Sequence, residues 1–265
     1  MELRRVLFVH NPRPGAATAA ERGRAWCRAK GIDAEIYAQG APVPDSVDLV
    51  AAVGGDGTLL WAARLVYPRE VPVLGVNAGG LGFLAACDAD RIADALEEVS
   101  AGKGRLERRA RLVARGPGFA LSALNEVAVV GSDGERFTKL DVEIDGEQAL
   151  KVEGDGLIVS TPTGSTAYAL AAGGPVLLPT VPATVLVPLA SHRLGGRPLV
   201  LPDGRDISVR ARCPARVFLD GEPVHDLKGG DVVQVKPAPA ATVLVRLAET
   251  GSFFARLRDK LGWSE

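Results

Sequence analysis

The chain has 265 residues, 47% of them hydrophobic, so it can bury a sizeable core and most naturally divides into two domains. Its 31 Lys and Arg residues nearly balance its 32 Asp and Glu residues, and the net charge is -1. No basic run stands out, so nucleic acid is not expected as a partner. A small molecule or another subunit is expected instead.

The cysteines and the apolar runs bear on the compartment in which the protein works. Cys27, Cys87 and Cys213 are widely separated and form no C-x-x-C pair, so neither a disulfide framework nor a zinc site is expected. The apolar core at residues 6–9 is too short for a signal peptide, and no apolar run reaches the roughly 18 residues that span a membrane. We expect a soluble, cytoplasmic protein with no membrane partner.

The first hundred residues alternate between strand and helix patterns. Apolar runs of strand length occur at residues 6–9, 35–37, 49–53 and 71–76, and helix patterns occur at 16–30, from about 58, and at 88–99. Such alternation predicts an α/β domain whose sheet is mostly parallel.

A glycine-rich turn lies where the strand at 49–53 passes into a helix. Gly54, Gly55, Gly57 and Thr58 are its members. Glycine lacks the Cβ that would hold a phosphate away from the backbone N–H groups. The helix that follows points its unpaired N–H groups and positive dipole end at the same place. The turn is therefore predicted to bind the phosphates of a donor.

Asp56, in the middle of this turn, is unusual there because its carboxylate would repel a phosphate. The carboxylate becomes useful if it holds a metal ion or takes a proton from a hydroxyl that attacks the phosphate. The alternative is that Asp56 only caps the helix, since Asp is common where helices start. The residues of the turn alone leave both interpretations open.

A second glycine-rich loop, at residues 77–84, follows the next strand along the chain. The carboxyl ends of parallel strands meet at one edge of a sheet, so this loop should lie beside the first. Asn77, Gly79 and Gly80 are therefore predicted to line the same phosphate-donor site.

The second half of the chain has the pattern of a β domain. Apolar and polar residues alternate, and further strands are predicted at 124–130, 140–144, 157–160, 184–189, 207–212, 232–235 and 242–247. Asp145-Gly146 and Asp220-Gly221 are typical of tight hairpin turns. A mainly β domain at residues 104–240 is thus predicted to follow the α/β domain at 1–103.

The C-terminal segment, residues 241–265, is predicted to contain a strand and then a helix. Apolar and charged residues at 252–263 segregate as on an amphipathic helix. Its apolar face must dock on something, and we expect the helix to pack back on the first domain.

A hydroxyl-rich loop lies inside the β domain, in the block at residues 154–175. The strand at 157–160 leads into a loop with five Ser and Thr side chains and then into a short Ala-rich helix that carries Tyr168. Capping a helix needs only one or two hydroxyls. The surplus favours recognition of a polyhydroxyl or amide-bearing ligand.

Taken together, these motifs resemble the NAD kinase family over most of the chain. The residues that carry the resemblance are Gly-Gly-Asp-Gly-Thr at 54–58, the loop at 77–84, Asn125-Glu126, and the block from Asp155 to Pro175. The resemblance implies a kinase that phosphorylates the 2′-hydroxyl of the adenosine ribose of NAD to give NADP. The donor would be ATP, another nucleoside triphosphate or polyphosphate, carried with a divalent metal ion such as Mg²⁺.

The resemblance also implies roles for individual residues. Asp56 is similar to the base at the 2′-hydroxyl, with Gly57 beside it. Asn125 and Thr163 resemble the adenine contacts, and Glu126 resembles a ribose contact. From the residues alone, Asn125-Glu126 would be a polar pair at a strand edge.

Further residues resemble the rest of the family's dinucleotide site. Asp155 is similar to the residue that reaches the nicotinamide carboxamide, often from a neighbouring subunit. The wall of the site corresponds to Thr166, Ala167, Tyr168, Ala169, Leu170 and Ala171, and variable contact positions correspond to Arg136, Glu153 and Glu222. Relatives are dimers or tetramers, so a homodimer or homotetramer is expected. Pairing between subunits would also cover the edges of a many-stranded β domain.

Two positions depart from the family pattern, and two other functions must be weighed. Gly80 stands where many relatives have a polar or basic residue, and Trp61 stands where many have Arg, His or Tyr, which leaves the donor's identity open.

A lipid kinase would share the glycine turn, but the polar segment after Asp155 disfavours a channel for acyl chains. A non-catalytic NAD sensor would have no use for Asp56 in the phosphate turn.

Overall fold

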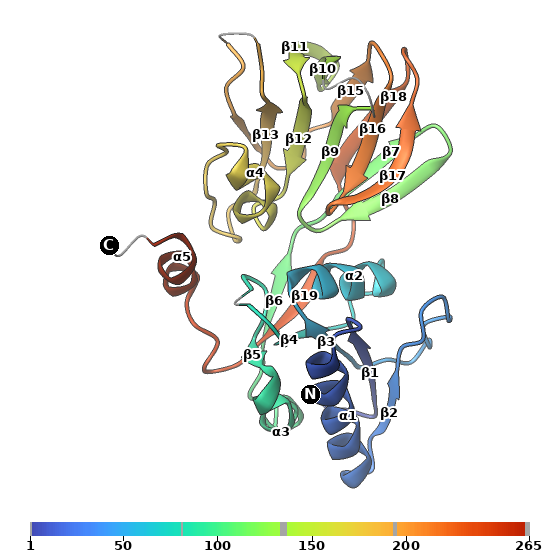
Figure 1. Ribbon diagram of the computed structural model, residues 1–265, viewed down its shortest axis with the longest axis vertical. Coiled ribbons are helices and arrows are strands. Elements are labelled where there is room, and N and C mark those ends of the chain that lie inside the picture. The colour runs from blue at the N-terminus through green and yellow to red at the C-terminus, as the bar shows by residue number, and fades with distance from the viewer. Residues whose placement is uncertain (1, 81, 133–136, 193–194, 263–265) are drawn as a thin grey trace. The chain divides into compact units, whose positions relative to one another are not determined.

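The computed structural model describes residues 2–80, 82–132, 137–192 and 195–262, which fall into two compact units (Figure 1). Unit 1 comprises residues 1–108 and 242–265, and unit 2 comprises residues 109–241. The chain therefore leaves unit 1 after its first hundred residues and returns to it near the C-terminus.

The described residues of unit 1 form a seven-stranded sheet in the order β2-β1-β3-β4-β19-β6, with β5 paired to β4. The pairings of β1 with β2 and β3, of β3 with β4, and of β4 with β5 and β19 are all parallel. The predicted α/β class with a mostly parallel sheet is confirmed. The strands are β1 (Arg5–His10), β2 (Asp33–Ile36), β3 (Leu49–Gly54), β4 (Val73–Asn77), β5 (Cys87–Asp88), β6 (Arg105–Arg109) and β19 (Thr242–Arg246).

Helices α1 (Pro14–Ala29), α2 (Asp56–Val66) and α3 (Ile92–Ser100) pack against the strands of unit 1. A further helix, α5 (Phe253–Leu261), follows the last strand. Strands β3 and β4 are buried along their whole length, as their runs of Val, Ala and Leu predict for parallel strands covered on both faces. Apolar residues of α1 and α3, such as Ala20 and Leu96, complete this core.

The strand order of unit 1 marks a ligand-binding edge. The chain passes from β1 outward to β2 on one side, and then continues with β3 and β4 on the other side of β1. Ligands of open α/β sheets bind at the carboxyl ends of the strands where the order reverses. Strand β1 ends at His10 and β3 ends at Gly54, so the predicted phosphate turn lies at that edge.

Unit 2 consists of two antiparallel sheets, as predicted for a mainly β domain. One has the order β11-β10-β15-β18-β7-β8, and the other has the order β14-β13-β12-β9-β16-β17. Apolar residues of both sheets, such as Val142 and Val129, form one buried core. The strands of the first sheet are β7 (Leu112–Gly116), β8 (Phe119–Ala123), β10 (Thr138–Ile144), β11 (Glu147–Gly154), β15 (Ile207–Ala211) and β18 (Val232–Pro237).

The second sheet of unit 2 carries the hydroxyl-rich loop and a short helix. Its strands are β9 (Glu126–Gly131), β12 (Gly156–Ser160), β13 (Ala183–Leu189), β14 (Leu199–Pro202), β16 (Ala215–Leu219) and β17 (Glu222–Leu227). The 3₁₀ turn at Gly164–Thr166 leads into helix α4 (Tyr168–Ala171). Ala169 of α4 packs with Ile158 and Val187 of the sheet.

Both predicted hairpin turns are confirmed. Asp145 and Gly146 have φ angles of 52° and 82°, and Asp220 and Gly221 have φ angles of 51° and 82°. Positive φ at both central residues is the geometry that Asp-Gly favours and that matches the twist of the flanking strands. These turns join β10 to β11 and β16 to β17.

The C-terminal helix belongs to unit 1, as predicted. Helix α5 begins after Ser252, whose Oγ accepts a hydrogen bond from the Ala255 backbone N–H at 3.1 Å, and ends at Gly262, which has a φ of 63°. Lys260 Nζ lies 4.7 Å from the centroid of the Phe83 ring, which brings α5 against the second glycine-rich loop.

The helix predicted at residues 88–99 starts later than expected, and the reason is local pairing. Cys87–Asp88 form β5 beside β4, and Ala89–Arg91 form a 3₁₀ turn, so α3 begins only at Ile92.

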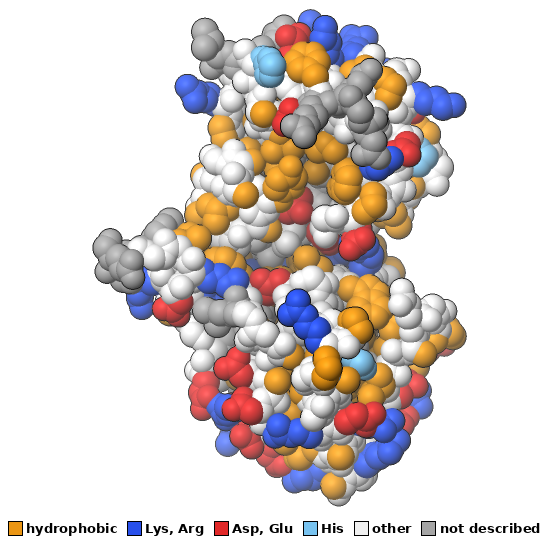
Figure 2. Space-filling view, viewed as in Figure 1, with side chains coloured by type: hydrophobic (Ala, Val, Ile, Leu, Met, Phe, Trp, Pro, Cys, Tyr) orange, Lys and Arg blue, Asp and Glu red, His pale blue; other side chains and the backbone are white. Residues whose placement is uncertain are grey.

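None of the helices in the described part of the chain is long and apolar enough to cross a membrane. Acidic and basic side chains are interspersed over the face drawn in Figure 2.

Candidate functional site

The glycine turn between β3 and α2 leaves backbone open to a ligand. A Cβ on Gly54 would lie 2.3 Å from Thr58 Oγ1 and 2.8 Å from Asn11 Nδ2, so only glycine allows this packing. Gly55 and Gly57 are exposed, and a Cβ on either would meet nothing within 4 Å. Unpaired N–H groups at the start of α2 are therefore accessible to an anion.

The carboxylate of Asp56 joins the two glycine-rich loops. Its Oδ2 accepts a hydrogen bond from the Phe83 N–H at 2.8 Å, and its Oδ1 accepts one from the Leu84 N–H at 3.1 Å. The residue at the N-cap of α2 is Gly55, and no side chain caps the helix there. The interpretation of Asp56 as a simple helix cap is therefore wrong.

Asn77, at the end of β4, presents an unsatisfied oxygen at the same edge. The side chain is 9% exposed, and its Nδ2 donates to Asp88 Oδ1 at 2.9 Å. Its Oδ1 is buried and has no hydrogen-bond partner among the described residues. Because a buried unpaired acceptor is costly, this oxygen is a candidate to bind a ligand or a cation.

Arg13 was not predicted as a site residue, yet it lies beside the second loop. Its Nη1 would be 3.5 Å from a Cβ on Gly79, and its backbone N–H donates to Asn11 Oδ1 at 3.1 Å. The signal in the sequence was its place in the turn after β1, next to β3 in the sheet. A guanidinium here adds positive charge to the predicted phosphate edge.

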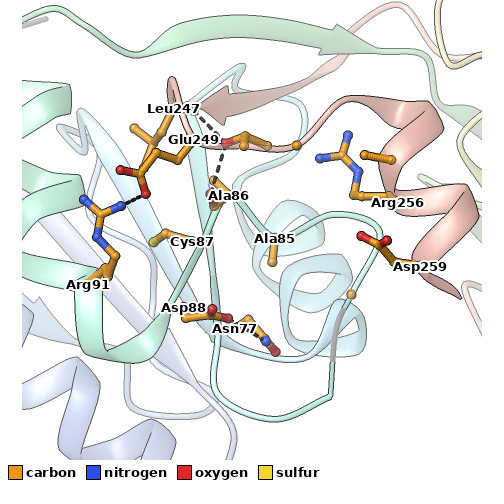
Figure 3. Close-up of a pocket in the computed structure, with 14 residues that line it drawn as sticks. Asn77, Ala85, Ala86, Cys87, Asp88, Arg91, Leu247, Glu249, Arg256 and Asp259 are labelled. Atoms are coloured by element: carbon orange, nitrogen blue, oxygen red, sulfur yellow. Dashed lines mark hydrogen bonds and ion pairs between the residues drawn. The ribbon is translucent and has the colours of Figure 1, made fainter.

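A cavity of about 220 Å³ lies between the second glycine-rich loop and α5 (Figure 3). Asn77 and Asp88 form one side, Arg256 and Asp259 project from α5 on another, and Arg91 pairs with Glu249 at the rim.

Two ionisable groups that line this cavity have shifted pKa values. The pKa of Arg256 is lowered mainly by burial and secondly by the charge of the nearby Arg246. Burial also raises the pKa of the Cys87 thiol to about 12, so this thiol is no nucleophile at neutral pH.

In unit 2, Asp220 organises the predicted adenosine contacts. Its carboxylate accepts hydrogen bonds from the N–H groups of Leu124, Asn125 and Glu126, at 3.0, 2.7 and 3.3 Å. The hairpin turn between β16 and β17 thereby fixes the backbone at the start of β9. Asn125 and Glu126 are both buried.

Glu126 is held in an environment that disfavours its ionised form. The side chain is 4% exposed, and its Oε2 has no hydrogen-bond partner in the described part of the chain. Burial, and then the charge of Asp220, raises the pKa of the Glu126 carboxyl to about 8. At neutral pH Glu126 is therefore mainly protonated and can donate a hydrogen bond.

The hydroxyl-rich loop is tied tightly to Asn125. A Cβ on Gly164 would lie 2.1 Å from the Asn125 carbonyl oxygen, and the Arg109 guanidinium donates to Thr163 Oγ1 at 3.2 Å. The hydroxyls donate to backbone carbonyl oxygens, Ser160 to Asn125 and Thr161, Thr161 to Leu124, Ser165 to Pro162, and Thr166 to Thr163. The surplus of hydroxyls thus serves mainly to build the loop, which weakens the argument that it marks a polyhydroxyl ligand.

The structure groups some of the predicted NAD contacts and separates others. One end of β9 and β12 holds four of them together, namely Asn125, Glu126, Thr163 and Thr166. The run that follows in the chain is Ala167, Tyr168, Ala169, Leu170 and Ala171, the last four of which form α4. Glu222 begins β17, just after the turn that carries Asp220.

Asp155 and Glu153 lie at the other end of β12. The Asp155 carbonyl accepts from the Gly131 N–H, whereas Ser160, at the far end of the strand, pairs with Glu126. Five residues of strand separate the two ends, roughly 16 Å. The predicted contact Arg136 lies outside the described residues.

An α/β unit with an exposed glycine turn, a carboxylate in that turn and a two-sheet β unit fit a nucleotide-dependent phosphotransferase, and the comparisons with known proteins show this class. Residues 25–104 match the ATP-NAD kinase N-terminal domain, and residues 124–247 match the ATP-NAD kinase C-terminal domain. The chain belongs to the NAD kinase family, as the sequence motifs indicated.

Curated relatives agree with this assignment over most of the chain. The chain is 42% identical to an NAD kinase of Gemmatimonas aurantiaca over 226 residues, 82% of this chain and 78% of that protein. It is 39% identical to an NAD kinase of Moorella thermoacetica over an alignment of 270 positions, gaps included, which covers 98% of this chain and 81% of that protein.

Solved structures share the fold. A yeast NADH kinase complexed with NADH superposes with a TM-score of 0.92 at 24% identity, covering 100% of this chain and 89% of the other. An NAD kinase from Archaeoglobus fulgidus in complex with ATP gives a TM-score of 0.82 at 26% identity, covering 97% of each chain.

Proposed function

We propose that Asp56 is the general base of NAD phosphorylation, taking the proton of the 2′-hydroxyl of the adenosine ribose. The reaction itself follows from the family, whose members phosphorylate NAD to NADP with ATP. The observation that supports the role is the placement of the carboxylate in an anion-binding turn, half-buried and held by the Phe83 and Leu84 N–H groups. Each carboxylate oxygen keeps a lone pair for a hydroxyl proton.

The glycine-rich loops of unit 1 are proposed to bind the donor's phosphates. The residues concerned are Gly54, Gly55, Gly57, Thr58, Asn77, Gly79 and Gly80. The open backbone at Gly55 and Gly57 supports this, as does the helix end behind it. The Archaeoglobus relative was solved with ATP, which favours ATP as donor. Polyphosphate is the alternative that a direct comparison of donors would decide.

A divalent metal ion, Mg²⁺, is proposed to arrive with the donor. No group of three His, Cys, Asp or Glu side chains in the described residues is arranged to hold a metal on its own. The oxygens available at the turn are those of Asp56 and the unpaired Oδ1 of Asn77, which line the same recess. A small set of hard oxygen ligands fits Mg²⁺, which keeps phosphate and water ligands. When bound, the ion would neutralise charge on the transferring phosphoryl group.

Unit 2 is proposed to recognise NAD through the residues that the family resemblance indicated. Asn125 and Thr163 would read the adenine, and Glu126 would bind the ribose. Because Glu126 is mainly protonated at neutral pH, it can donate to a ribose oxygen without adding charge next to the ligand's phosphates. Arg136, Glu153 and Glu222 are further proposed contacts. The yeast relative, solved with NADH, has the same fold.

We further propose that the active form is a homodimer or homotetramer in which Asp155 serves a neighbouring subunit. The distance of Asp155 from Asn125 and Thr163 along β12 supports a role outside its own site. Mixing an Asp155→Ala protein with an Asp56→Asn protein should restore part of the activity, because some sites receive both intact residues. An enzyme that is monomeric by light scattering at assay concentration and fully active contradicts the proposal.

The reaction is tested by incubating the protein with NAD, ATP and MgCl₂ and measuring NADP. Formation of NADP that requires both NAD and donor is the expected result. Binding of NAD without any NADP, under conditions in which the protein is folded, would make the chain a sensor rather than a kinase. Replacing ATP by polyphosphate in the same assay tests the donor.

A further inference from the structure

Both backbone groups of Leu84 are hydrogen-bonded, and the two partners come from distant parts of unit 1. Its N–H donates to Asp56 Oδ1 at 3.1 Å, and its carbonyl accepts from Arg246 Nη1 at 2.7 Å. Arg246 lies 162 residues further along the chain. The backbone of a single residue, Leu84, thus connects a buried guanidinium to the proposed base.

Arg246 is held rigidly in its place. It is the last residue of β19, which pairs with β4 through Leu244 and Val73, and its side chain is 2% exposed. Its Nε donates to Glu107 Oε2 at 2.9 Å, and its Nη1 also reaches the Ala85 carbonyl at 3.4 Å. The planar fork can make these bonds together because its donors are fixed relative to one another, which a lysine ammonium cannot match.

We propose that Arg246 is a positioning residue for phosphoryl transfer, acting through the backbone of Leu84 to fix the second glycine-rich loop against Asp56. This inference rests on the proposed role of Asp56. The loop contains Gly79, Gly80 and Gly82, so its own backbone resists motion little. The bond from the guanidinium to the Leu84 carbonyl fixes the Leu84–Ala85 peptide, and the N–H donated to Asp56 belongs to the peptide just before it.

A buried arginine can also matter for stability alone, and the two roles differ in a measurable way. A purely structural Arg246 would contribute equally whether or not residue 56 is a carboxylate. A residue that acts through Asp56 loses its effect on turnover once the base is removed. A double-mutant cycle measures this difference.

The experiment combines Arg246→Lys with Asp56→Asn and measures kcat and the KM for NAD and ATP in all four proteins. Arg246→Lys alone should lower kcat by about 10- to 100-fold with little change in KM, because it misplaces the base rather than the substrates. In the Asp56→Asn background the same change should lower kcat by less than about threefold. Equal losses in the two backgrounds overturn the proposal.

Two further variants keep the test decisive. If Arg246→Lys does not fold, Glu107→Gln takes its place in the cycle. This change weakens the bond that orients Arg246 but keeps a hydrogen-bond acceptor. Its loss of kcat should be smaller than that of Arg246→Lys, and it should disappear when Asp56→Asn is also present. Arg111→Lys is the matched control, because Arg111 is another arginine of 2% exposure, bonded to Ser122 in unit 2. Any effect of Arg111→Lys should be the same in both backgrounds. Near-normal turnover of Asp56→Asn itself would instead contradict the role of the base.

Discussion

Gly82 leaves the space that the Asp56 carboxylate occupies. A Cβ on Gly82 would lie 2.2 Å from Asp56 Oδ1 and 3.0 Å from its Cγ, far inside the contact distance of these atoms. The turn at 54–58 and the loop at 77–84 therefore depend on each other. The aspartate needs a glycine opposite it, and the Phe83 and Leu84 N–H groups that follow this glycine hold the aspartate.

Gly82→Ala should accordingly damage the reaction more than the fold. The methyl group would displace the carboxylate, and we expect kcat to fall by about 10²-fold or more. Gly251→Ala is the matched control, since it adds the same methyl group in unit 1 at a position where Ala255 Cβ, 3.8 Å away, makes only an ordinary contact. Steady-state kinetics and melting temperatures of both variants check this. A loss of kcat at Gly251→Ala as large as at Gly82→Ala would show that displacement of Asp56 is not the cause.

Asp56→Asn should reduce turnover by roughly 10²- to 10⁴-fold, because the amide cannot accept the hydroxyl proton. The structure adds a second expectation. An amide offers one oxygen, so one of the two N–H groups, of Phe83 or Leu84, loses its acceptor and faces an NH₂ group. A modest fall in melting temperature should accompany the kinetic loss, while NAD affinity measured by calorimetry changes little. Near-normal turnover would leave Asp56 a structural link between the loops.

The fold class and the outline of the site could be predicted because both rest on local patterns. Alternating strands and helices predicted the parallel sheet, and Asp-Gly dipeptides predicted the two hairpins. Strands such as β6, with the sequence Arg-Leu-Glu-Arg-Arg, escaped prediction because they carry charged rather than alternating apolar residues.

What the sequence could not provide were partnerships between residues far apart in the chain. The bonds from Phe83 and Leu84 to Asp56, and from the residues around Asn125 to Asp220, depend on the folded sheets. The same holds for the protonation of Glu126, which follows from burial and from Asp220, 94 residues away. The hydroxyl-rich loop is a further case, since Thr161 Oγ1 donates to the carbonyl of Leu124, which lies 37 residues away in the chain.

Asn125→Ala should weaken NAD binding without unfolding unit 2. The hydrogen bonds that tie Asn125 into the fold use its backbone, the N–H to Asp220 and the carbonyl from Thr161 N and Ser160 Oγ. Alanine keeps all of them. Loss of a buried amide partner should cost about 1–3 kcal/mol of NAD binding, and the apparent ATP constant should hardly change. Equal losses for NAD and ATP in titrations would place Asn125 away from the adenine.

The protonated state of Glu126 should make the protein less stable as pH rises. The pKa of this carboxyl is about 8 in the folded chain, against an ordinary value of 4.5, so between these values the folded state binds a proton that the unfolded state has released. Its contribution to stability is therefore fully present below about pH 4.5, and it is lost as pH rises through 8, by up to about 1.4 kcal/mol per pH unit.

The measurement is denaturant unfolding at several pH values between 5 and 9, with Glu126→Gln as the control. Gln stays neutral at every pH, so the free energy of unfolding of Glu126→Gln minus that of the wild type should grow with pH up to about 8 and then level off. Exposed carboxyls with lowered pKa, such as Asp145 and Asp226, give a slope of the opposite sign in the acid range, but both proteins share them and the difference removes it. A difference that stays constant with pH would mean that Glu126 is already ionised in the folded protein. Its proposed donation to the ribose would then be wrong as well, because an ionised carboxylate can only accept hydrogen bonds.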